Sequence, residues 1–374
     1  MVVTPVRVPF FDLRPAHAQL NEELLRDIGE LLDSGAFVNG PAVAEFEKEF
    51  ARFAGRTACV GTASGLDALR LGLLAAGLEP GDEVIVPATT FVATFEAVTQ
   101  AGGRPVAADV SEADLNIDVQ AAEAAVSERT RFLLPVHLYG QLADMRAILA
   151  LADRHGLHVI EDACQAHGAA RDGLRAGATG LAAAFSFYPA KNLGAFGDAG
   201  ALVADGEELA TRVRMLREHG QREKYRHELE GYTARLDTIQ AIALLHKLPL
   251  LDSWNEQRRA AAARYAALLD GVGDLRLPPV APGSEPVWHA FLVRAAEPER
   301  LATHLANRGI QTGRHYPEPP HRAVAYAQLG YAQGEFPVTE ALSAELLSLP
   351  IFPGIADEQI DAVVEAVGDY YRRG

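Results

Sequence analysis

With 374 residues, the chain is long enough for a large core and for two domains, or for one domain with a smaller one appended. Hydrophobic residues make up 49% of it and charged residues 22%, which is typical of a soluble globular protein. Its 50 Asp and Glu residues outnumber 34 Lys and Arg, and the formal net charge of −16 argues against bulk binding to nucleic acid or anionic membranes.

The cysteines and the N-terminal residues indicate a cytoplasmic protein. Cys59 and Cys164 are far apart and lie in or beside apolar stretches, which predicts buried free thiols in a reducing compartment. No metal-ligand spacing is present, so we expect no metal site. The N-terminus does not resemble a signal peptide, and no apolar run reaches the ~18 residues of a membrane span.

Two helices are predicted ahead of the first strand. Apolar residues recur at helical spacing over residues 21–34, and Gly35 supplies the stop. A second helix is predicted over 41–53, with Pro41 in its first turn. The apolar arm between them, residues 35–41, is a candidate for packing against a partner chain.

From residue 57 onward, short predicted strands alternate with helices. This rhythm is typical of right-handed crossovers and a mainly parallel sheet covered by helices on both faces. Two further strands, at 182–187 and 201–204, bring the expected sheet to about seven strands. The other strands are expected at 57–60, 83–86, 105–108, 132–136 and 158–161, and the helices at 66–76, 91–101 and 142–155.

The pattern changes after the sheet. A helix over 207–218 precedes a polar, charged stretch, 219–234, that we expect to be a mobile loop. Asp237 then opens a helix with Gln240 three residues on, which is a capping-box arrangement. A helix over 252–269, a Pro and Gly cluster over 277–286, a strand over 288–293 and helices over 299–308 and 357–370 follow. We predict a large domain, 1–250, and a small C-terminal α+β domain, 251–374.

Lys191 is the first candidate catalytic residue, although most lysines are solvated surface residues. It lies where a predicted strand gives way to a glycine-rich loop, and an amine there becomes a nucleophile if its pKa is lowered. Asp162 ends an earlier strand in the run HVIEDACQAHG. A carboxylate and a lysine at strand ends of one sheet are the charged groups that pyridoxal phosphate needs, for its pyridinium nitrogen and its aldehyde.

A phosphate site is predicted at the turn from the first strand into the next helix. Gly65 and Leu66 offer backbone N–H groups there, at the positive end of a helix dipole, although many such turns bind nothing. Ser186, five residues before Lys191, is placed to donate its hydroxyl to the same phosphate. Phe91 is a candidate to lie flat against an aromatic cofactor ring, or else to fill the core.

Several motifs, spread over nearly the whole chain, together resemble the nucleotide-sugar aminotransferases of the DegT type. The resemblance implies the aspartate-aminotransferase-like fold (fold type I), pyridoxal 5'-phosphate as cofactor, and a homodimer with shared active sites. The motifs are TASGLDAL at Thr62, VIVPATTFVAT at Val84, PVHLYGQLADM at Pro135, VIEDACQAHGA at Val159, SFYPAKNLGAFGDAGA at Ser186, RLDTIQA at Arg235 and TGRHYPEPPH at Thr312.

The resemblance also implies roles for single residues. Lys191 would bond to the cofactor aldehyde, Asp162 would pair with the pyridine nitrogen, and Gln165 would lie by the ring hydroxyl. The phosphate would be held by Ser186 with the backbone of Gly65 and Leu66, and Phe91 would stack on the ring.

The chain departs from the family pattern in two places. The family commonly has an asparagine that reaches the partner subunit's phosphate where this chain has Thr233, a shorter residue that offers only a hydroxyl. It commonly has glycine at the position of Ala199, which we expect to matter little.

The segment KNLGAFGDAG is similar to the branch of the family that aminates C3 of a sugar. By that resemblance Tyr188, His315 and Tyr316 face the hexose, and the basic segment around Lys224 meets the diphosphate. The expected acceptor is a dTDP-linked 3-keto-6-deoxyhexose, with L-glutamate as amino donor.

Other functions stay open at this point. A UDP-linked 3-keto uronic acid, a 4-keto sugar or an inosose are alternative acceptors. Related sugar dehydratases replace the lysine with histidine, whereas this chain keeps Lys191. A non-catalytic regulator of the same fold would be expected to lose Asp162 or Lys191 first, and both are present.

Overall fold

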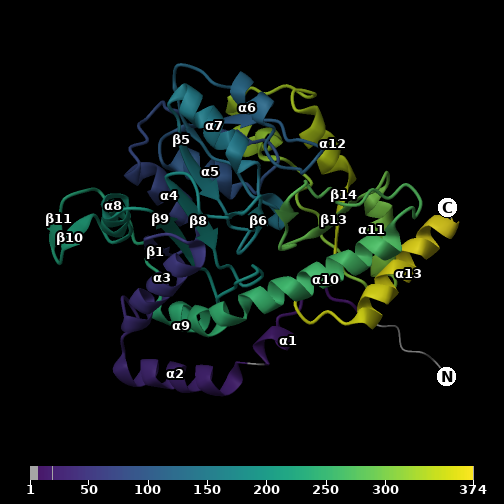
Figure 1. Cartoon of the computed structure of the whole chain (residues 1–374), viewed down its shortest axis with the longest axis horizontal. Helices are drawn as coiled ribbons and strands as arrows, with labels where there is room; N and C mark the ends of the chain where they lie inside the picture. The colour runs from purple at the N-terminus through teal and green to yellow at the C-terminus, as the bar shows by residue number, and fades with distance from the viewer. Residues whose placement is uncertain (1–6, 19, 374) are drawn as a thin grey trace.

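A seven-stranded sheet forms the centre of the computed structural model, which describes residues 7–18 and 20–373 (Figure 1). The strand order is β1-β9-β8-β5-β4-β2-β3. Strand β9 is antiparallel to β1 and β8, and all other neighbours are parallel, which confirms the predicted mainly parallel sheet. The strands are β1 (Ala58–Thr62), β2 (Glu83–Pro87), β3 (Arg104–Ala108), β4 (Thr130–Leu133), β5 (His158–Asp162), β8 (Ala182–Ser186) and β9 (Gly200–Ala204).

Helices cover both faces of the sheet because successive strand residues point to opposite sides. In β8, Ala182 and Ala184 belong to one core and Ala183 and Phe185 to the other. The first core is completed by α4 (Gly65–Ala75), α5 (Ala93–Gln100) and α8 (Glu207–Arg217), and the second by α3 (Pro41–Ala54), α7 (Met145–His155) and α9 (Thr238–Lys247). Because both faces of these strands are covered, every residue of β1, β2 and β9 is buried, including the polar Thr62 and Glu83.

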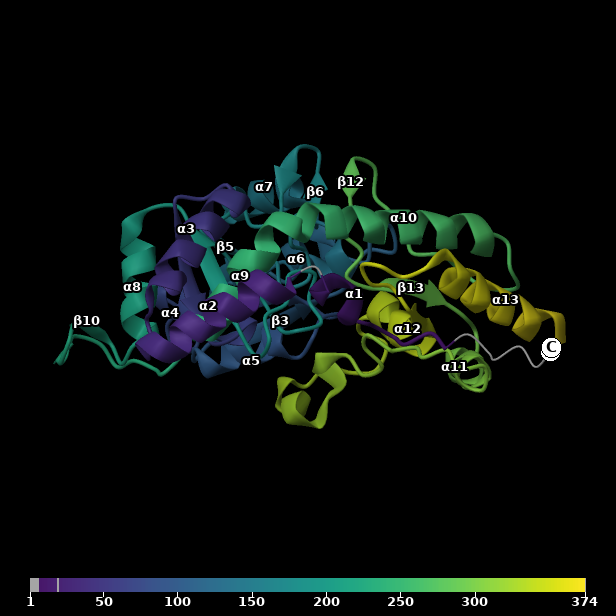
Figure 2. The same cartoon turned by 90° about the horizontal axis from the view of Figure 1, so that it is seen from below.

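A second, smaller core lies around the antiparallel pair β13 (Phe291–Arg294) and β14 (Leu346–Leu349). Helix α10 (Leu251–Leu269) runs from the large sheet toward this core, where it packs against α13 (Asp357–Arg373), which in turn packs against α11 (Pro298–Ala306) (Figures 1 and 2). Val8, near the start of the chain, is buried in the same core, and its backbone pairs with that of Ile310. The N-terminal segment therefore packs on the C-terminal part of the chain.

The structure corrects two local predictions. Residues 219–234, expected to be a mobile loop, contain a hairpin of β10 (Gln221–Glu223) and β11 (Arg226–His227), which projects at the left edge of Figures 1 and 2. The prediction of a capping box at Asp237 is wrong, because the Asp237 side chain accepts no hydrogen bond from an N–H group of the first helical turn. Gln240 instead accepts a hydrogen bond of 2.8 Å from the backbone N–H of Phe196.

Helix α2 (Asn21–Ser34) ends at Gly35 as expected, in the left-handed conformation with φ of 67°. None of the helices in the described ranges is long and apolar enough to cross a membrane. Several short elements were not predicted from the sequence pattern, among them α1 (Arg14–His17), α6 (Val119–Ala124), β6 (Ala170–Arg171), β7 (Leu174–Arg175), β12 (Ser284–Glu285), α12 (Pro337–Glu345) and the strand β14.

Candidate functional site

The candidate site lies where β5 and β8 end side by side. The two strands are parallel, and Asp162 pairs in register with Ala184, so their carboxyl ends share one edge of the sheet. Ser186 is the last residue of β8, and Lys191 follows in a turn closed by a 2.8 Å hydrogen bond from its N–H to the carbonyl of Tyr188. The topology therefore brings the predicted lysine and carboxylate to the same edge.

The surroundings of Lys191 favour the neutral, nucleophilic form of its amine. Burial lowers its pKa below the ordinary value, while the neighbouring Cys164 and Asp162 act in the opposite direction. A lysine with a lowered pKa is neutral in a larger fraction of molecules, and only the neutral amine attacks a carbonyl carbon.

The carboxylate of Asp162 is held in one orientation. It is 5% exposed, and its Oδ2 accepts a 2.9 Å hydrogen bond from the Thr94 hydroxyl in α5. Its Oδ1 accepts a bond of 3.2 Å from the backbone N–H of Cys164. Sequence reasoning missed Thr94, because only the fold brings the start of α5 against the end of β5.

The first turn of α4, called the cradle below, packs closely against the end of β8. The Ser64 side chain accepts a hydrogen bond from the N–H of Asp67, whereas the N–H groups of Gly65 and Leu66, at the first two helical positions, have no partner inside the helix. A Cβ on Gly65 would lie 2.7 Å from Ser186 Cβ and 2.7 Å from Cys164 Sγ. Only glycine allows this approach, which brings the N-terminal end of α4 against Ser186 and Cys164.

Gln165, Tyr316 and Phe91 meet on one side of the site. Gln165 Nε2 donates a hydrogen bond of 3.0 Å to the Tyr316 hydroxyl. The rings of Phe91 and Tyr316 are 5.4 Å apart, and Phe91 is 51% exposed, so it does not fill the core. It precedes α5 instead of opening a helix at residue 91.

His315 lies beside Tyr316 and remains neutral at physiological pH. Burial, together with the charge of Lys191, lowers the pKa of His315 to about 4, and its Nδ1 lies 2.7 Å from Ser348 Oγ. Burial raises the pKa of Tyr316, so its phenol stays protonated. The backbone carbonyl of His315 accepts a bond from the hydroxyl of Tyr139, a residue whose role the sequence did not reveal although it lies in the PVHLYG motif.

Three further predicted residues lie outside this cluster. Tyr188, whose carbonyl closes the turn at Lys191, is 54% exposed. Thr233 lies 3.3 Å from His219 Nε2, and the ammonium of Lys224, in the projecting hairpin, lies 5.3 Å from the Tyr225 ring centre. Among the contacts of the described residues, neither Thr233 nor Lys224 meets Lys191 within one chain.

The residues present fit pyridoxal phosphate. An amine with a lowered pKa lies at the same sheet edge as a fixed carboxylate, as the aldehyde and the pyridine nitrogen require. The cradle at Gly65 offers N–H donors to a phosphate, and a side chain there would fill the space. The exposed ring of Phe91 supplies an aromatic face.

Comparison with known proteins places the chain among sugar aminotransferases. A model of the DegT/DnrJ/EryC1/StrS aminotransferase family matches residues 18–368. The chain is 48% identical over 367 residues to the dTDP-3-amino-3,4,6-trideoxy-alpha-D-glucose transaminase of Streptomyces venezuelae, covering 98% of this chain and 97% of that protein. It is 43% identical over 360 residues to the UDP-N-acetyl-3-dehydro-alpha-D-glucosamine 3-aminotransferase of Acidithiobacillus ferrooxidans, covering 96% and 97%.

A solved structure agrees with these sequence comparisons. The crystal structure of S. venezuelae DesV in complex with a ketimine intermediate superposes with a TM-score of 0.96 at 48% identity. The match covers 99% of this chain and 100% of that one.

Proposed function

Because the chain belongs to the DegT/DnrJ/EryC1/StrS aminotransferase family, it is a pyridoxal-phosphate-dependent sugar aminotransferase, and we propose that its amino acceptor is a dTDP-linked 3-keto-6-deoxyhexose. L-Glutamate is proposed as the donor. The observation that carries the choice of sugar is the 48% identity, along 98% of the chain, to a transaminase named for a dTDP-3-amino sugar. The segment KNLGAFGDAG is in keeping with amination at C3.

Each predicted cofactor residue keeps its role in this proposal. Lys191 would bond to the aldehyde, and Asp162 would face the pyridine nitrogen. Gln165 would lie by the ring hydroxyl and Phe91 against the ring. The phosphate is held by the Ser186 hydroxyl and the N–H groups of Gly65 and Leu66, a role supported by the close approach of Gly65 to Ser186.

In the proposed mechanism, Asp162 and Lys191 each act on one proton. When bound, pyridoxal phosphate supplies an electron sink for the carbanion formed at the amino-bearing carbon. Asp162 would hold a proton on the pyridine nitrogen, and the hydrogen bond from Thr94 fixes the orientation of its carboxylate. Once the donor's amino group has replaced it at the aldehyde, Lys191 Nζ would be free to take the proton from the donor's Cα and pass it to the cofactor carbon, and burial lowers its pKa in favour of the neutral amine.

We propose that the hexose is bound by Tyr188, His315 and Tyr316. A neutral imidazole and a protonated phenol each pack on a sugar ring and offer one hydrogen bond to a hydroxyl. Their lowered and raised pKa values support these protonation states. Lys224, in the projecting hairpin, is proposed to meet the diphosphate bound in a partner's site, where a cation is favourable.

We propose that the enzyme is a two-fold homodimer in the cytoplasm. The apolar side chains that support a partner surface lie on α2, the arm 35–41 and α9, and are Leu25, Leu32, Phe37, Val38 and Ile239, all at least 37% exposed. Thr233 and Lys224 would then act across the dimer. Sedimentation at working enzyme concentration should show a dimer, and an active monomer would be incompatible with shared sites.

The substrate proposal is tested with purified enzyme, glutamate and a panel of nucleotide sugars. The dTDP-3-keto-6-deoxyhexose should be aminated, with one 2-oxoglutarate formed per amino sugar. The matched 4-keto isomer tests the position, and a UDP-3-keto uronic acid tests the rival that the relative from A. ferrooxidans suggests. Amination of only the 4-keto sugar, or only the UDP sugar, would contradict the proposal.

A further inference from the structure

The turn Leu138–Gly140 touches three parts of the molecule, and its middle residue, Tyr139, contacts each of them. The N–H of Tyr139 donates a hydrogen bond of 2.7 Å to Gln165 Oε1, next to the end of β5. Its carbonyl accepts a bond of 3.4 Å from the N–H of Ala290, in the segment that leads to β13. Its hydroxyl donates a bond of 2.6 Å to the carbonyl of His315.

The backbone of this turn is shaped for close approach to the segment 287–290. Tyr139 has φ of 61° and Gly140 φ of 93°, both in the left-handed region. A Cβ on Gly140 would lie 2.8 Å from the N atom of His289 and 3.0 Å from that of Trp288. The N–H of Val287 also donates to the carbonyl of Gly140 at 2.9 Å. The glycine thus lets the segment pack directly on the turn.

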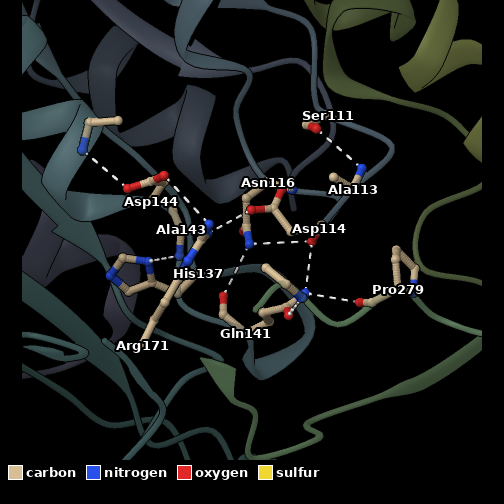
Figure 3. Close-up of polar contacts among 12 residues, drawn as sticks. Ser111, Ala113, Asp114, Asn116, His137, Gln141, Ala143, Asp144, Arg171 and Pro279 are labelled. Carbon is tan, nitrogen blue, oxygen red and sulfur yellow. Dashed lines mark hydrogen bonds and ion pairs between the residues drawn. The ribbon is translucent and has the colours of Figure 1, made fainter. Parts of the chain in front are cut away.

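The opposite side of the turn is fastened mainly to the loop between β3 and α6. Asn116 Oδ1 accepts a 3.1 Å bond from the N–H of Leu138, and Asn116 Nδ2 lies 3.3 Å from the carbonyl of Gln141. Gln141 Nε2 in turn donates to the carbonyls of Asp114 at 3.0 Å and Pro279 at 3.2 Å (Figure 3). Buried side chains with satisfied hydrogen bonds hold one geometry, so the turn is a fixed reference point for what contacts it.

The contact with Tyr139 also sets the direction of a hydrogen-bond chain. A backbone N–H can only donate, so the atom of Gln165 that it meets is the amide oxygen. The amide nitrogen then faces the Tyr316 hydroxyl and donates to it. The hydroxyl of Tyr316 accepts from Gln165, and no hydrogen bond from its own proton is seen among the described residues, so that proton can be donated to an oxygen of a ligand.

We propose that Tyr139 is a positioning residue of the amination reaction. Its backbone N–H orients the Gln165 amide, and its hydroxyl fixes the segment that contains His315 and Tyr316. This inference rests on the proposed function, in which His315 and Tyr316 contact the hexose. It adds a residue that contacts neither the sugar nor the cofactor but sets the place of two that do.

Tyr139→Phe tests the proposal because it removes only the hydroxyl and keeps the backbone bond to Gln165. We expect kcat/KM for the keto sugar to fall about tenfold, since a buried carbonyl loses its partner and the sugar-contacting segment moves. The half-reaction with glutamate, followed by the cofactor spectrum, should change by less than about twofold. Tyr265→Phe is the matched control, because within the described residues the buried Tyr265 hydroxyl has no hydrogen-bond partner; neither half-reaction should change.

A second measurement needs no substrate or cofactor. Amide hydrogen exchange of residues 313–318 in the cofactor-free protein should be faster in Tyr139→Phe than in wild type, and unchanged in Tyr265→Phe. Unchanged exchange in Tyr139→Phe, or an equal fall in both half-reactions, would overturn the proposal. Failure of the wild-type enzyme to aminate the sugar would instead contradict the proposed function, and the exchange comparison would still decide the role of Tyr139.

Discussion

The Thr94 hydroxyl donates a 2.9 Å hydrogen bond to Oδ2 of Asp162 and so joins the start of α5 to the end of β5. Because the backbone N–H of Cys164 binds Oδ1, both oxygens of the carboxylate have a donor within the chain. The carboxylate therefore has a fixed direction before any ligand binds, which is the preorganisation that electrostatic catalysis requires.

Asp162→Asn is expected to abolish most transamination without unfolding the protein. The amide has nearly the same shape, but it cannot hold a proton on the pyridine nitrogen by charge. We predict a fall in kcat of at least about 100-fold, with cofactor binding retained. Steady-state kinetics and a cofactor titration by absorbance check this, and a variant with near-normal kcat would show that Asp162 does not act on the cofactor.

The neighbouring acid, Glu161, should give the opposite result. Its side chain is fully buried, and it accepts bonds from the N–H groups of Gly177 and Thr179 and lies 2.7 Å from His137 Nε2. Glu161→Gln places an NH₂ donor among these donors, so we expect stability to fall by roughly 3 kcal/mol. Urea unfolding measures the loss, and activity per folded molecule should stay close to that of wild type.

Gly65→Ala should weaken the binding of pyridoxal phosphate. The added methyl group would lie 2.7 Å from Ser186 Cβ, so the first turn of α4 must shift and its N–H groups move. We predict a Kd raised about tenfold, or about 1.4 kcal/mol, in a fluorescence titration. Gly368→Ala is the control, because its methyl group meets only the flexible end of Arg372, at 3.1 Å. Equal affinities for pyridoxal phosphate in both variants would contradict a role of the cradle in binding the phosphate.

The pH response of His315 follows from its lowered pKa of about 4. In the unfolded chain a histidine has a pKa of about 6.5, so between these values the unfolded state binds more protons. The stability linked to His315 is thus complete above about pH 6.5 and is lost as the pH falls toward 4. We predict an NMR titration midpoint near pH 4 for its ring, whereas a midpoint near 6.5 would contradict a buried neutral imidazole.

The sequence was sufficient where the pattern is local and repeated. Apolar strands that alternate with helices predicted the sheet, and its parallel order brings the ends of β5 and β8 together, so Asp162 and Lys191 could be paired before the structure was known. Gly65 followed from the strand-to-helix turn at Ser64, since the physics of helix N-termini is local.

The features that the sequence did not reveal depend on contacts between residues that are far apart in the chain. The Gln240 side chain fits a capping box by spacing, but the fold offers it the N–H of Phe196 instead. The two-residue strands β6 and β12 pair across more than a hundred residues, too short to leave a pattern. Tyr139 could not be assigned a role because its partners, Gln165 and His315, converge on it only in three dimensions.

The most direct test is to find which lysine carries the cofactor. The purified protein is loaded with pyridoxal phosphate, reduced with borohydride and digested, and the modified peptide is located by mass spectrometry. The account predicts one pyridoxyl label, on Lys191, and none on the folded Lys191→Ala variant. A label on another lysine in the wild-type protein, or a label that persists in Lys191→Ala, would contradict the assignment of the active site.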